Sequence, residues 1–60
     1  MIKSLYVDQI GFVQVGTSFM GEYVYDLIEY SPNEEMYRCY INKELVTEYN
    51  KKYVIQINYE

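Results

Sequence analysis

The side chains that usually perform enzymatic chemistry are few in this sequence, and their spacing assembles no catalytic group. The chain contains no His, the commonest general base near neutral pH. The hydroxyl groups of Ser4, Thr17 and Ser18 therefore lack an evident activating base, and Cys39 lacks a His partner. Nucleophilic catalysis of the Ser-His or Cys-His kind is thus excluded by the residue inventory.

Paired carboxylates and metal ligands are equally sparse. Glu34 and Glu35 are adjacent in a turn-rich segment, where we expect solvated side chains rather than two acids held across a cleft. One Cys without any His cannot form a zinc site. The sequence also lacks the spacing of calcium-binding and phosphate-binding loops. We therefore expect no enzymatic activity, no cofactor and no metal.

The tyrosines have a recognisable binding chemistry. Nine of the 60 residues are Tyr, and aromatic residues make up 18% of the chain. Tyr and Arg are enriched at the energetic centres of protein interfaces, because they combine apolar area with hydrogen-bonding groups. The sequence predicts protein contacts by residues around its centre, namely Ile28, Tyr30, Arg38 and Tyr40, with Tyr23 as a lesser candidate. Packing inside the fold is the alternative for each of them, and for Ile28 it is the favoured one.

A central hairpin must position these residues. The segments 22–30 and 36–41 are rich in aromatic and β-branched residues, and the intervening Ser-Pro-Asn-Glu-Glu is typical of a turn. A loop formed by residues 31–35 predicts that Tyr30 faces Met36 and Leu27 faces Cys39. One face of the hairpin would then hold Tyr25, Leu27, Cys39 and Ile41, and the other would hold Asp26, Ile28, Arg38 and Tyr40, with Asp26 in reach of Arg38. Because both faces are apolar in part, we expect the rest of the chain, a second copy or a partner to cover the second one.

The composition predicts an all-β fold. Ala, the best helix former, is absent, and the abundant Tyr, Val and Ile favour a pleated surface. We expect a single small domain over residues 1–60, built as an antiparallel meander of about four to five strands with at most one short helical turn. Cys39 cannot form an intramolecular disulfide because it is the only Cys, and it is expected to be a packed thiol.

The other segments fit this meander. Residues 2–15 form an extended segment interrupted at Gly11, and residues 53–59 form the clearest strand. Asn42 suits a two-residue hairpin turn, and residues 43–49 are a returning strand or a helical turn. The turns at 31–35 and 50–52 fall at the same end of the sheet. Phe19 and Met20, between two glycines, fold back onto the core or form an apolar docking tip.

The opening Ser4-Leu5-Tyr6-Val7-Asp8, the length and the number of strands resemble SH3 domains. The chain has no Trp pair, no Ala-Leu-Tyr-Asp-Tyr sequence and no Pro before Tyr53, which are features of that family. The resemblance therefore implies an SH3-like barrel shape, and no SH3 binding residue is carried over to this chain.

Charge and composition bound the function. The net charge of −4 disfavours nonspecific binding to nucleic acids and anionic membranes. We expect a small acidic protein-binding module, a bacterial or phage inhibitor that blocks a host protein in the cytoplasm. One alternative is a structural homo-oligomer, for example a homodimer, assembled through sheet faces or edges. The other is a nucleic-acid mimic or a small nucleic-acid-binding barrel.

Overall fold

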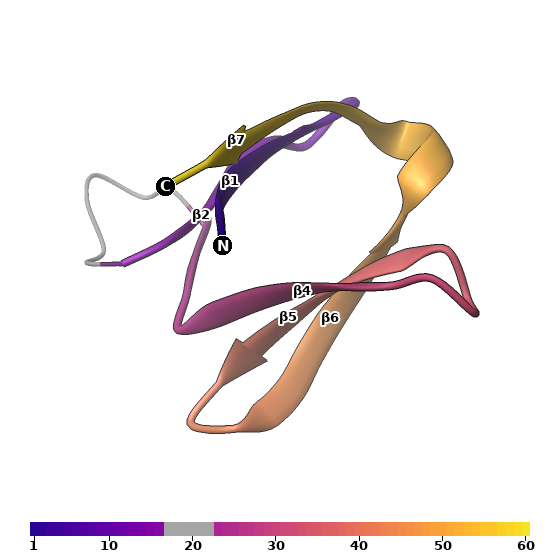
Figure 1. Ribbon diagram of the computed structural model, residues 1–60. Helices are drawn as coiled ribbons and strands as arrows, with labels where there is room; N and C mark the ends of the chain where they lie inside the picture. Colours follow the sequence, from indigo (N-terminus) through magenta and orange to yellow (C-terminus); the bar gives the residue numbers. More distant parts are fainter. Residues whose placement is uncertain (17–22) are drawn as a thin grey trace.

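The computed structural model describes residues 1–16 and 23–60, and these residues form strands with one short helical turn. The elements are β1 (Ile2–Val7), β2 (Gly11–Val15), β3 (Tyr23–Tyr25), β4 (Leu27–Ser31), β5 (Met36–Ile41), β6 (Glu44–Asn50), the 3-10 helix η1 (Lys51–Tyr53) and β7 (Val54–Tyr59) (Figure 1). The predicted all-β fold is confirmed. The structure has more strands than predicted, because the expected segments 2–15 and 22–30 are each divided into two strands. The predicted tip at Phe19 and Met20 lies outside the described residues.

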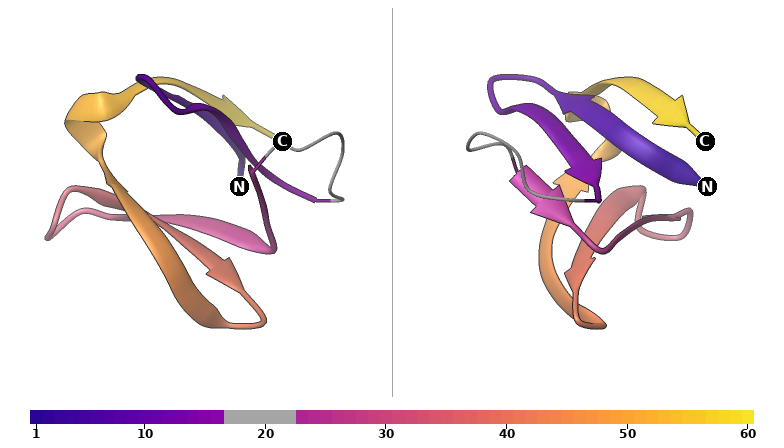
Figure 2. Two further views of the ribbon diagram at one scale, coloured as in Figure 1. Left: turned by 180° about the vertical axis from the view of Figure 1, so that it is seen from behind. Right: turned by 90° about the vertical axis from the view of Figure 1, so that its left-hand side faces the viewer.

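The described strands form two sheets, which lie as two layers. The first has the strand order β3-β2-β1-β7, and the second is the meander β4-β5-β6. The chain passes between the layers through Asp26 and through η1 (Figures 1 and 2). The pairing is antiparallel except between β2 and β3, which are parallel. Strand β3 is thus the exception to the predicted antiparallel pairing, and the chain continues from it into β4 of the other sheet.

The hydrophobic core lies between the two layers. It receives side chains from both sheets, since alternate residues of a strand point to the same face. Its buried members are Leu5, Val7, Val13, Tyr25, Ile28, Tyr37 and Cys39. Cys39 is fully buried, which confirms the predicted packed thiol.

Several turns contain residues in left-handed backbone conformations, which residue types tolerate to different degrees. Gly11 has a φ of 108° at the start of β2, where a residue with a Cβ would be strained. Asn42 and Lys43 have φ values of 52° and 67° and connect β5 to β6 directly. This is the predicted two-residue hairpin, and residues 44–50 form a strand rather than a helical turn.

The β4–β5 hairpin differs from the predicted register. Ser31 pairs with Met36, so the loop comprises residues 32–35, and Ile28 rather than Leu27 faces Cys39. Glu35 closes this loop with a φ of 56°. The register places Ile28 and Cys39 together in the core, where they are 2% and 0% exposed.

The two turns expected at one end of the sheet do meet. The backbone N–H of Lys51 donates to the carbonyl of Glu35 at 3.0 Å, and Lys51 Nζ lies 3.8 Å from Glu35 Oε2. Asn50 caps η1, because its Oδ1 accepts from the backbone N–H of Lys52 at 3.0 Å. In the described ranges, no helix has the length and apolar character needed to span a membrane.

Candidate protein-binding face

The outer face of the β4–β5–β6 sheet carries two rows of side chains that cross all three strands. Leu27 of β4, Tyr40 of β5 and Leu45 of β6 lie opposite one another, and we call them the apolar row. Glu29, Arg38 and Glu48 lie opposite one another in the same way, and we call them the charged row. The rows are neighbours on one face because Arg38 and Tyr40 are two residues apart on β5.

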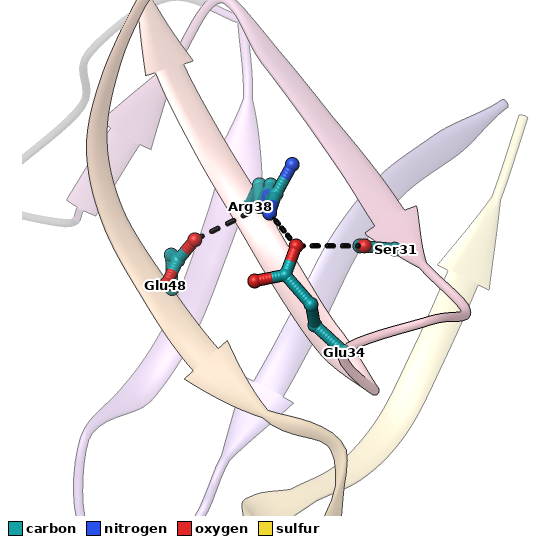
Figure 3. A network of polar contacts seen from close by, with 4 residues as sticks. All are labelled: Ser31, Glu34, Arg38 and Glu48. Carbon is teal, nitrogen blue, oxygen red and sulfur yellow. Dashed lines mark hydrogen bonds and ion pairs between the residues drawn. The ribbon is translucent and has the colours of Figure 1, made fainter.

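Arg38 lies at the centre of the charged row and binds two carboxylates. Its Nε donates to Glu48 Oε1 at 3.1 Å, and its Nη2 contacts Glu34 Oε1 from the preceding turn (Figure 3). Ser31 Oγ donates to the same Glu34 oxygen at 3.4 Å. These contacts fix the direction of the guanidinium group. The Arg38 and Glu48 side chains are each 30% exposed, so each pair is expected to contribute about 1 kcal/mol or less to stability.

A surface depression adjoins the apolar row. Its volume is about 500 Å³, and it is lined by Asp26, Leu27, Glu29, Tyr40, Asn42 and Lys43. Asp26 Oδ2 accepts from the backbone N–H of Asn42 at 2.6 Å, which joins the bend between β3 and β4 to the β5–β6 turn. The depression therefore combines an aromatic and an aliphatic wall with charged groups at its margin.

Carboxylates outnumber cations around the two rows. Glu29, Glu34 and Glu48 surround one guanidinium group, so this part of the face has an excess of negative charge. An acidic margin around apolar side chains is complementary to a protein surface that carries Lys or Arg around an apolar patch. The predicted ion pair between Asp26 and Arg38 does not form, because Arg38 binds Glu34 and Glu48 and Asp26 binds the backbone of Asn42.

The structure brings together two of the five residues predicted to contact a partner. Arg38 and Tyr40 share the outer face. Ile28, predicted on the same face, is 2% exposed and lies in the core. Packing inside the fold was the favoured alternative for this residue. Tyr30 is 37% exposed, and its ring lies 4.7 Å from that of Tyr37 toward the core side. The backbone of Tyr23 pairs with Val13 in the other sheet.

Sequence reasoning missed four members of this face, Leu27, Glu29, Leu45 and Glu48. A signal for Leu45 was present, since a two-residue turn at Asn42 and Lys43 places it opposite Tyr40. Glu48 lies opposite Arg38 only because the register shifts between Cys39 and Tyr40, which the sequence did not indicate. The wrong β4 register concealed the other two. Leu45 is the most exposed apolar member, at 48%.

Two buried groups behind this face have raised pKa values. Burial raises the pKa of the Cys39 thiol to about 11. Burial also raises the pKa of Tyr37, with further contributions from the nearby Tyr59 and Tyr30. A thiol with such a pKa is a poor nucleophile near neutral pH, so Cys39 acts as a packing residue.

Metal ligands do not gather on the part of the chain that the structure describes, where no group of three or more His, Cys, Asp or Glu side chains could hold a metal ion. Comparisons of the chain with protein-family models, with curated proteins and with solved structures find no match. The SH3-like barrel shape therefore stays a prediction from the sequence.

Proposed function

We propose that the chain is a protein-binding module whose outer β4–β5–β6 face docks on a basic surface of another protein. The proposal rests on the apolar row lying beside the charged row on one face. Tyr40 and Leu45 supply apolar contact area, and the acidic margin attracts a positively charged partner and orients it.

Arg38 has two roles in the proposed interface. It is bound by Glu34 and Glu48, so its guanidinium group is already oriented before a partner arrives. A preorganised side chain loses less conformational entropy on binding than a mobile one. Arg38 therefore holds the two carboxylates in place, and it presents its remaining N–H groups to the partner.

The proposed module acts as an inhibitor of a host protein. Inhibition of a host protein by steric occlusion requires only a binding face and no catalytic group, which suits the residue inventory. The residue usage, rich in Ile, Asn, Lys and Tyr, favours a bacterial or phage origin and thus action in the cytoplasm of a bacterium or of an infected cell.

Capture from a bacterial lysate tests the proposal. The affinity-tagged chain is expected to retain a defined protein, identified by mass spectrometry, and the double variant Arg38→Ala and Tyr40→Ala is expected to bind it at least about tenfold more weakly. Loss of the Tyr40 ring removes apolar contact area, and loss of Arg38 releases the two carboxylates. The affinity of the purified pair is measured by titration calorimetry.

Tyr53→Ala is the matched control, because Tyr53 is 49% exposed and belongs to η1 rather than to the binding face. It should leave the affinity unchanged. Raising the salt concentration should weaken the unmodified complex, since the acidic margin contributes to association. Equal capture by the control and the double variant, both folded by circular dichroism, would exclude this face.

A further inference from the structure

The four strands that form sheet edges within the described ranges differ in how they are protected. Strands β4 and β6 carry Glu29, Glu44 and Glu48, and β3 has only three residues. Charged side chains and short length are the usual means by which edge strands avoid pairing with other chains. Strand β7 has neither protection, because all six residues of Val-Ile-Gln-Ile-Asn-Tyr are uncharged and none is Pro.

Large apolar side chains of β7 are also exposed. Ile55 is 65% exposed and Tyr59 is 64% exposed, although a domain this small depends on burying its apolar side chains for stability. Strand β7 pairs with β1 on one side, and the strand order places no described strand on its other side. Its second row of backbone N–H and C=O groups is therefore available for pairing.

The uncharged surface continues from this edge onto the adjoining sheet face. Gln56 Nε2 donates to Asn58 Oδ1 at 3.1 Å, and Asn58 Nδ2 donates to Ser4 Oγ at 3.0 Å. Beside them, the rings of Tyr6 and Phe12 pack edge to face with centroids 4.9 Å apart. A second molecule approaching this edge thus meets amides and aromatic rings instead of the acidic groups found on the opposite sheet.

We infer that β7 is the edge through which two copies of this chain pair, as antiparallel strands related by a two-fold axis at Ile57. The regular part of the β1–β7 ladder is Gln56–Asn58, and register shifts flank it on both sides. An axis at the centre of this part places Gln56 opposite Asn58 of the second copy. Continuing the same residue-by-residue register beyond this part, past the register shifts, places Ile55 opposite Tyr59 of the second copy.

This register explains why a second copy fits better than an unrelated strand. Amide faces amide, and the two exposed apolar residues face each other, so one sequence satisfies both sides of a symmetric interface. Each chain has a net charge of −4, which opposes self-association over most of the surface. The uncharged edge is where two such chains can approach without like-charge repulsion. The pairing leaves the apolar and charged rows free, since these belong to the other sheet.

Sedimentation equilibrium from about 10 μM to about 1 mM tests the inference. The unmodified chain is expected to dimerise within this range. The double variant Ile55→Lys and Tyr59→Lys places lysines opposite each other in the proposed register, and it should raise the dissociation constant at least about tenfold. The variant Ile55→Lys and Tyr59→Glu places opposite charges there, and it should dimerise more tightly than the double-lysine variant.

Leu45→Lys is the matched control, because Leu45 is an exposed apolar residue on the other sheet, and it should leave dimerisation unchanged. Circular dichroism establishes that every variant is folded. A monomer throughout the concentration range overturns the inference, even if the β7 edge binds a different protein. Equal dissociation constants for the double-lysine variant and the lysine–glutamate variant also overturn it, because residues 55 and 59 would then not face each other.

Discussion

Replacement of Leu5 by Ala is expected to remove a large share of the stability of this domain. Leu5 is fully buried between the two sheets, where it packs with Val7, Val13 and Cys39. Truncation of a buried Leu to Ala costs about 3 to 5 kcal/mol, because it loses transfer free energy and leaves a cavity. A chain of 60 residues is expected to have a total stability of about 3 to 9 kcal/mol. Urea unfolding followed by circular dichroism measures the change in free energy.

Leu45→Ala is the control for this prediction, since it makes the same chemical change at a site that is 48% exposed. Its effect on the free energy of unfolding should be about 1 kcal/mol or less, because little surface is removed from water at that position. Similar unfolding midpoints for the two variants would contradict the placement of the core between the sheets.

Alkaline pH is expected to destabilise the fold through Cys39. The pKa of its thiol is raised by burial from 9.0 to about 11 in the folded chain. Between these values the unfolded state has lost the proton and the folded state keeps it, so stability falls as the pH rises. One pKa unit corresponds to about 1.4 kcal/mol, which gives an expected loss of about 1 to 3 kcal/mol across this window. Urea unfolding at pH 7 and near pH 11 measures it.

The variant Cys39→Ala separates this contribution from others. It should be less stable than the unmodified chain at pH 7, because Cys39 is buried, and it should lose less stability on going to alkaline pH. Part of the loss should persist, since the pKa of Tyr37 is raised in the same direction. An unchanged pH dependence in Cys39→Ala would show that the thiol does not contribute.

Features that depend on local sequence were predictable. Alternating residues predicted a strand at 53–59, which the structure has at 54–59, and the tolerance of Asn42 for positive φ predicted the hairpin between β5 and β6. The meeting of Glu35 with Lys51 followed from counting strand directions. The register of the β4–β5 hairpin was not predictable from turn preferences, because Glu35 adopts a φ of 56° that its residue type does not favour.

The candidate binding face could be predicted only in part, because it depends on the register between β4, β5 and β6. Arg38 and Tyr40 were found from their residue types, and their position on one strand keeps them together in any register. Each row takes one residue from β4, one from β5 and one from β6, so a wrong register on one side of β5 hides one of the three members of each row. Ile28 shows the same effect, since a shift of one residue exchanges the core face with the outer face.

The pairing of β1 with β7 has a consequence for how the chain folds. These strands are neighbours in one sheet although they come from opposite ends of the sequence, and Ile2 pairs with Tyr59. The β4–β5–β6 meander can form from local contacts, whereas β1 gains its second neighbour only after the longest loop in the molecule closes. Such non-local pairing slows the search for the native state, so refolding is expected on a scale of milliseconds to seconds, with the meander protected from hydrogen exchange before the first sheet.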